Sequence, residues 1–463
     1  MSRKEKIGLL LLVVIATAPF VVNLRDTFLS DDWDWLRITR ERDQPLYEYF
    51  ATNYEGTRDR GSYRPMMNVF WVTHEALYGL EPIGYHASLI LLHVVNTLLV
   101  YLILLRLPWI PTNRRTVCAF FTALFFAILP SHAEAVAWIA AVNDPLMTFF
   151  YLLSLLALLR ARDASSRRTW WYIGSLISFT LSLLTKEMAL TLPLVVGPFI
   201  LLDSLHGKGR SAGATIKRTA LLATPYLALL ALYFFVRWYA TGVFFGYYSH
   251  DVDPSGEVFF LSYASMMIGH LFSNPWRTVV TEWVFSVKDV VLGATALFGM
   301  IALLFAAQKR RGRVMFALGA AWLVTLLPLS SFVLPISKYM SEEGERWIYL
   351  PSVFFCALVA YVLTYVFLVR RYVAVILVAL IVLFWTTTLF EKTWRWHEGA
   401  LLARQTIASF LAIAEREKYD GIVAVGRPET FHGVLLFRTG FPQAIELMGG
   451  RRHDILPIAY TWY

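Results

Sequence analysis

Long apolar stretches separated by short basic segments constrain this chain more than any other feature of its sequence. The first stretch runs from Ile7 to Phe28, and a helix of this length spans about 33 Å, the thickness of a bilayer core. Of the 463 residues, 57% are hydrophobic and only 16% are charged, which is more apolar surface than a soluble core needs. The sequence therefore predicts an all-α polytopic membrane protein.

About eleven transmembrane helices can be drawn along the sequence. They cover residues 7–28, 84–105, 116–131, 145–161, 170–184, 188–204, 218–240, 287–307, 314–334, 348–369 and 372–390. Alternate connecting segments are rich in Lys and Arg, which places them and the N-terminus inside. The formal charge of +9 therefore reflects membrane topology, and we expect no nucleic-acid partner.

Two of the external connections are long. The first contains two aromatic amphipathic stretches, Pro45–Phe50 and Met66–Tyr78, which suit the membrane interface. The fourth runs from His250 to Ser286. Together they suit the roof of a cavity at the external surface.

The composition changes after the last span. We assign residues 1–411 to the transmembrane domain and residues 412–463 to a small extracytoplasmic α/β unit, with a strand at Gly421–Val425. About fifty residues are marginal for independent folding, so we expect this unit to pack on the membrane domain.

An acidic cluster, Asp31, Asp32 and Asp34, follows the first span directly. Carboxylates this close repel one another, so at least one should have a raised pKa unless a cation, substrate or metal compensates. One interpretation is a general base. The other is a polar stop that keeps the next segment out of the lipid, and the cluster alone does not decide between them.

A second polar cluster lies at the external ends of spans 3 and 4, where His132 and Glu134 precede Asp144. These side chains suit a metal, a phosphate or a substrate hydroxyl, and they equally suit capping of helix ends. Because both acidic clusters face the same side, we favour the functional interpretation.

Two cations occupy external turns. Lys186 precedes Glu187 before span 6, and Arg346 follows Glu345 before span 10. Arginine can present a bidentate fork to a phosphate, whereas lysine acts as a point charge. The alternative is that the lysine side chain only extends toward lipid headgroups.

Acids and cations on one membrane face suit sugar transfer from a polyprenyl-phosphate sugar to a hydroxyl acceptor. The leaving phosphate is a weak base, so the reaction needs cations to stabilise it and a carboxylate to take the acceptor proton. Direct displacement at the anomeric carbon would invert its configuration.

Six motifs occur in order along about residues 20–410. They are Asp31-Asp32, residues 62–65 (SYRP), residues 79–86 (GLEPIGYH) with 93–96 (HVVN), residues 129–138 (LPSHAEAVAW), Lys186-Glu187 and residues 345–351 (ERWIYLP). This ordered set resembles the type C (GT-C) glycosyltransferase superfamily. More narrowly, it resembles the transmembrane O-mannosyltransferases that carry tetratricopeptide repeats, and their bacterial relatives.

The resemblance implies that a first-loop acid, Asp31 or Asp32, is the catalytic base. It implies a further set of substrate-binding residues: Tyr63, Arg64, His132, Glu134, Asp144, Lys186, Glu187, Glu345 and Arg346. The chain departs from the family in two ways. No tetratricopeptide pattern follows the membrane domain, and Val142-Asn143 precedes Asp144 where relatives often have Gly-Arg.

The sequence leaves several alternatives open. A divalent cation, Mg or Mn, has candidate ligands in Asp32, His132 and Glu134, although two phosphate-facing cations would make it dispensable. The acceptor is a protein, glycan or lipid hydroxyl, and the sugar is not identified. The bacterial relatives and the C-terminal unit imply a bacterial inner membrane with a periplasmic active site and C-terminus.

Two other functions compete with the transferase. A lipid-linked sugar transporter or flippase predicts polar groups through the midplane of several spans, whereas here they cluster at the external ends. A purely structural membrane scaffold leaves the matched acids and cations unexplained.

Overall fold

The protein is helical, and six of its helical segments are long and apolar enough to cross a membrane. The computed structural model describes residues 3–59, 61–107, 110–164, 166–197, 212–244, 266–267, 270, 310–329, 344–417, 422–424, 428–449 and 455–457. The six segments among them are Glu5–Arg25, Ile83–Leu104, Ile139–Asp163, Ala220–Thr241, Glu345–Val369 and Arg371–Ile413. In lipid, a helix satisfies its own backbone hydrogen bonds, which is why these apolar sequences adopt it.

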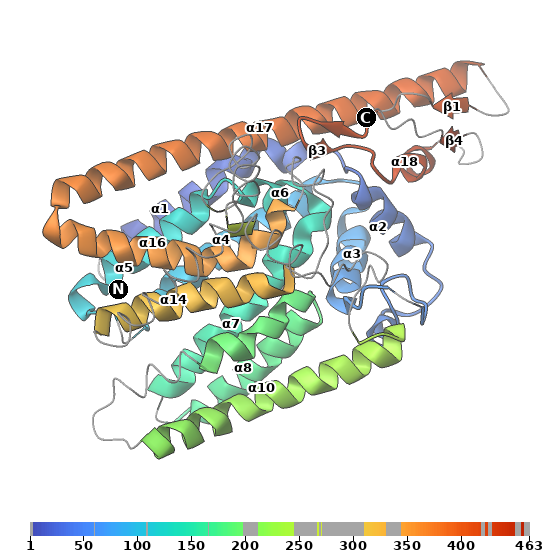
Figure 1. Ribbon diagram of the computed structural model, residues 1–463. Helices are drawn as coiled ribbons and strands as arrows, with labels where there is room; N and C mark the ends of the chain where they lie inside the picture. The colour runs from blue at the N-terminus through green and yellow to red at the C-terminus, as the bar shows by residue number, and fades with distance from the viewer. Residues whose placement is uncertain are drawn as a thin grey trace, which may run out of the picture.

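The helices form an elongated bundle (Figure 1). They are α1 (Arg3–Thr17) with its extension η1 (Ala18–Arg25), α4 (Ile83–Leu104), α5 (Thr112–Ile128), α7 (Asn143–Asp163), α8 (Arg168–Leu183), α10 (Ala212–Thr241), α14 (Arg310–Leu326) with η5 (Leu327–Leu329), α16 (Tyr349–Val369) and α17 (Arg371–Glu417). Helix α4 is central, since it packs against α1, α5 and α7, while α16 packs against α5 and α14. The predicted span 287–307 and most of the predicted loop 250–286 lie outside the described residues, so the count of eleven remains a prediction.

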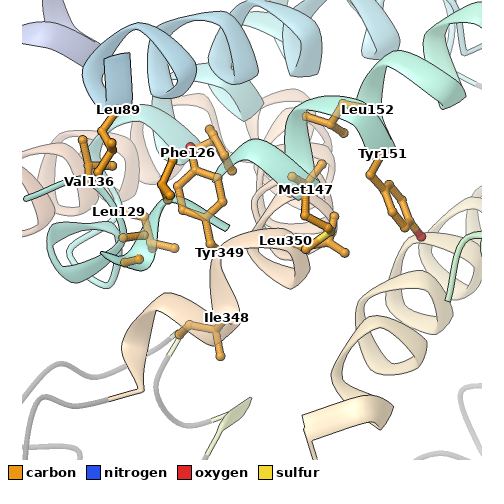
Figure 2. Close-up of a cluster of buried hydrophobic side chains, with 14 of the residues drawn as sticks. Leu89, Phe126, Leu129, Val136, Met147, Tyr151, Leu152, Ile348, Tyr349 and Leu350 are labelled. Atoms are coloured by element: carbon orange, nitrogen blue, oxygen red, sulfur yellow. The ribbon is translucent and has the colours of Figure 1, made fainter. Parts of the chain in front are cut away.

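The core between these helices is apolar and closely packed. Figure 2 shows Tyr349, at the start of α16, surrounded by side chains from neighbouring elements, including Phe126 and Met147. The rings of Tyr349 and Phe126 lie 5.2 Å apart at 72°. The Tyr349 hydroxyl shares a 2.8 Å hydrogen bond with Nδ1 of His93 on α4, which satisfies a polar group deep in the bundle.

Short helices gather at the end of the bundle away from the N-terminus (Figure 1). They are α2 (Asp31–Arg40), η2 (Leu46–Phe50), α3 (Pro65–Tyr78), α6 (His132–Ala137) and η3 (Ile139–Val142). Both stretches expected to be amphipathic are thus helical, and α3 begins at Pro65, whose fixed φ suits the first helical position. These short helices build the framework on which the charged residues lie.

The C-terminal part begins within a single helix of 47 residues, α17, which runs along the whole bundle (Figure 1). It passes through position 411, where the sequence suggested a boundary. After it, β1 (Ile422–Ala424) pairs in parallel with β4 (Ile455–Pro457), and β2 (Thr430–Phe431) pairs antiparallel with β3 (Val434–Leu435). The strand expected at 421–425 is therefore present, and α18 (Phe441–Leu447) packs on both α2 and α17.

Candidate active site

The first-loop acids lie in the first turn of α2, where the helix dipole favours negative charge. Asp32 is buried, and its two carboxylate oxygens accept hydrogen bonds from the backbone N–H groups of Leu29 at 2.8 Å and Ala140 at 2.7 Å. Burial raises the pKa of the Asp32 carboxyl well above its usual range, although the two backbone hydrogen bonds oppose the shift. Asp31, in contrast, keeps 33% of its side chain exposed. The two adjacent acids therefore have different surroundings.

The turn that precedes α2 adjoins the second polar cluster through a tryptophan. Trp138 donates a 3.3 Å hydrogen bond from its indole to the carbonyl oxygen of Leu29. The guanidinium of Arg346 lies over the same indole, 4.7 Å from the ring centroid. The turn at Leu29 and Arg346 therefore contact the same side chain, one at the indole N–H and the other over the ring face.

Glu134 holds Arg346 in place. Helix α6 packs on η6 (Glu345–Ile348), and Glu134 accepts hydrogen bonds from the backbone N–H groups of Gly344 at 3.2 Å and Arg346 at 2.8 Å. It also forms an ion pair with the Arg346 guanidinium. Burial raises the pKa of Glu134, and the charge of Arg346 opposes that effect. The Arg346 side chain, 14% exposed, is more accessible than that of Glu134.

A second ion pair joins the ends of α8 and α7. Lys186 precedes η4 (Glu187–Thr191), and its ammonium contacts both carboxylate oxygens of Asp144, at 2.6 and 2.7 Å. The pKa of Lys186 is lowered to about 8, mainly by burial and also by the positive charges of Arg64 and Arg346, while Asp144 opposes the shift. The charges of Arg64, Lys186 and Arg346, which come from separate parts of the chain, therefore influence one another.

The third cation, Arg64, shares its acidic partner with another arginine. Arg64 donates hydrogen bonds of 3.1 and 2.9 Å to one oxygen of Glu187, and Arg237 on α10 donates one of 3.1 Å to the other. Sequence analysis missed Arg237, because nothing in the apolar sequence of α10 indicates which wall of the bundle it faces. Two arginines therefore share one carboxylate.

Two of the expected site residues have mainly apolar or neutral surroundings. Tyr63 is buried and donates a 2.8 Å hydrogen bond to the carbonyl oxygen of Phe50. His132 is buried too and shares a 2.8 Å hydrogen bond through Nε2 with the hydroxyl of Ser352. Burial lowers the pKa of His132 well below its usual range, which favours the neutral imidazole.

The candidate metal ligands are not brought together. Asp32, Glu134 and His132 each have separate hydrogen-bond partners, as described above. Among the residues that the structure describes, no group of three or more His, Cys, Asp or Glu side chains has the arrangement of a metal site. The donor set therefore does not fit a resident divalent ion.

Glu345, the neighbour of Arg346, pairs with a cation of α17. Its carboxylate forms a buried ion pair with Lys392 of α17, with both distances 2.7 Å. Lys392 escaped the sequence analysis, although a buried acid at the start of a span is a signal that a cation must lie nearby. This pair fixes η6 to α17.

The fold is similar to that of a solved structure. Over 99% of its length, the chain superimposes on 86% of ArnT from Cupriavidus metallidurans, solved bound to undecaprenyl phosphate, with a TM-score of 0.52 and 16% identity. The chain therefore shares the fold of ArnT, which is the GT-C-like fold that the motifs indicated.

The comparison of sequences gives a narrower group of similar proteins than the comparison of structures. The chain is 24% identical to human protein O-mannosyl-transferase TMTC4 over 75% of its own length and 54% of that protein. It is 30% identical to protein O-mannosyl-transferase F38B6.6 of Caenorhabditis elegans over 41% of its length and 27% of that protein. The chain therefore spans about half the length of the first of these relatives, and no family model matches it. The predicted resemblance to the O-mannosyltransferases is confirmed.

Proposed function

We propose that this protein is a membrane glycosyltransferase that moves a sugar from a polyprenyl-phosphate donor to a hydroxyl acceptor at the extracytoplasmic face. The observation that carries the proposal is the convergence of Arg64, Lys186 and Arg346, each held by a carboxylate, at the end of the bundle where Asp31 lies. Relatives that are named O-mannosyl-transferases make a mannosyl donor the first to test.

The cations suit the leaving group. As the bond between the anomeric carbon and the phosphate oxygen breaks, its electron pair passes to the phosphate, and preorganised cations stabilise that charge. Arg64 and Arg346 can offer guanidinium hydrogen bonds while Lys186 supplies a point charge. Because phosphate is a weak base, no general acid is required.

Asp31 suits the role of base. The acceptor hydroxyl attacks the anomeric carbon from the side opposite the phosphate, and this attack inverts the configuration. The proton of the hydroxyl passes to the Asp31 carboxylate. Asp32 fits this role less well, since both its oxygens accept backbone hydrogen bonds and its side chain is buried. We assign Asp32 to holding the first loop against η3.

The test uses purified protein in lipid vesicles with a panel of polyprenyl-phosphate sugars. Release of polyprenyl phosphate together with a glycosylated acceptor is the expected result, and nuclear magnetic resonance of the product linkage reports inversion. Movement of the lipid-linked sugar across the bilayer without its release would instead identify a flippase.

A further inference from the structure

The C-terminal unit reaches the candidate base through the turn between β3 and α18. The Thr439 hydroxyl donates a 2.7 Å hydrogen bond to Oδ1 of Asp31, and the Arg438 guanidinium lies 3.7 Å from the same oxygen. The Ser30 hydroxyl lies 3.2 Å from Oδ1 and 3.3 Å from the Thr439 hydroxyl. All three contacts fall on Oδ1, so Oδ2 is the oxygen that we assign to the acceptor.

The backbone of this turn is fitted to the first loop. The N–H of Ser30 donates a 2.8 Å hydrogen bond to the carbonyl oxygen of Leu436. Gly440 has φ +79°, and a Cβ there would lie 2.3 Å from the carbonyl oxygen of Ser30, so only glycine permits the approach. Ser30 itself has φ 45°, a region that residues with a side chain rarely adopt. Such conformations persist where surrounding structure holds them.

The C-terminal unit is itself firmly anchored. Its side chains Leu436 and Phe437 are fully buried, and Phe441 packs against Phe437 and against Phe410 of α17, with ring centroids 4.9 and 5.4 Å apart. Close-packed interiors resist displacement, so the position of Thr439 is fixed relative to α17. A catalytic group needs such support, since small displacements are costly in rate.

From these contacts, we infer that Thr439 is a positioning residue for Asp31 and that the C-terminal unit forms part of the active site. This inference rests on the proposed function. The hydroxyl of Thr439 fixes the rotamer of the Asp31 carboxylate, and the Arg438 guanidinium lies beside the same oxygen. Oδ2 is thereby aimed at the acceptor hydroxyl.

The test compares Thr439→Val, which keeps the shape and removes the hydrogen bond, with Thr439→Ser, which keeps the hydroxyl. Thr430→Val is the matched control, because Thr430 is an exposed threonine of the same unit. We expect Thr439→Val to lower kcat about tenfold at saturating donor, with donor KM and melting temperature unchanged. Thr439→Ser should restore kcat, and Thr430→Val should match the parent.

Each outcome is decisive. A Thr439→Val variant with parental or higher kcat would overturn the inference, as would a loss that serine does not rescue. If the parent turns over and Asp31→Asn does not, the proposed function stands whatever Thr439 shows. If the parent releases no polyprenyl phosphate from any donor, both the proposed function and this inference are wrong.

Discussion

Two ion pairs at one end of this molecule differ in access. In the pair between Lys392 and Glu345, the side chains are only 2% and 1% exposed, so each charge is satisfied by the other and closed to solvent. In the pair between Arg64 and Glu187, the side chains are 22% and 18% exposed. Buried, closed pairs hold elements together, whereas cations with an accessible side can also receive a ligand.

Adjacent charged residues show the same difference in access. Glu345 belongs to the closed pair, while its neighbour Arg346 is held by Glu134 and remains partly accessible. Asp32 is closed by two backbone hydrogen bonds, while its neighbour Asp31 is partly exposed. The difference teaches that charge alone does not mark a functional residue, because neighbouring charged side chains differ in access.

The closed pair gives the largest expected effect. Lys392→Ala should lower the free energy of unfolding by about 3–5 kcal/mol, because it removes the ammonium that pairs with the buried Glu345 carboxylate. Denaturant titration in detergent measures the loss. The double variant Lys392→Met with Glu345→Gln removes both charges and should recover most of it. A single-variant loss near zero would show that solvent reaches Glu345.

An accessible cation should behave in the opposite way. Arg64→Gln should raise the donor KM about tenfold, equivalent to about 1.4 kcal/mol of binding, by removing a phosphate contact. Stability should change little, since Glu187 keeps Arg237 at 3.1 Å. Arg37→Gln, which removes a surface pair on α2, is the control and should leave KM unchanged. A loss of stability equal to that of Lys392→Ala would contradict the comparison, because Arg64 would then hold the fold together as Lys392 does.

The pH dependence of donor binding tests Lys186. Burial lowers its pKa to about 8, so the ammonium is charged below that pH and loses its charge as the pH rises through it. Donor affinity should therefore fall several-fold between about pH 7 and pH 9. Lys186→Arg keeps the charge and should remove the decline. A flat profile in the parent would mean that Lys186 does not contact the phosphate.

Chelation should have the smallest effect. The carboxylate oxygens of Asp32 and Glu134 accept backbone hydrogen bonds, so the candidate metal ligands are occupied by the protein itself. Turnover should be unchanged by EDTA and by later addition of Mg or Mn. Loss of activity that metal restores would place a cation among groups that we assign to the framework.

Part of this arrangement could be predicted from the sequence. Apolar length and basic loops predicted the membrane class, and helix ends predicted that Glu134, Lys186 and Arg346 would lie at one end. The strand at Ile422–Ala424 followed from its β-branched composition. These features depend on local sequence, which is why local patterns suffice.

Other features could not be predicted, because they depend on distant segments. Asp31 and Asp32 differ because Thr439 contacts one and Ala140 the other, 408 and 108 residues away along the chain. The pairing of Lys392 with Glu345 depends on α17 continuing as one helix beyond its apolar part. The pattern of apolar and polar residues along the sequence does not predict contacts between such distant segments.

The most direct test of the central claim compares Asp31→Asn with Asp32→Asn in turnover and in thermal stability. The account predicts that Asp31→Asn abolishes polyprenyl phosphate release while the melting temperature stays at the parental value. It predicts that Asp32→Asn lowers the melting temperature, because the amide nitrogen cannot accept one of the two backbone hydrogen bonds. An inactive but fully stable Asp32→Asn, together with an active Asp31→Asn, would contradict the account.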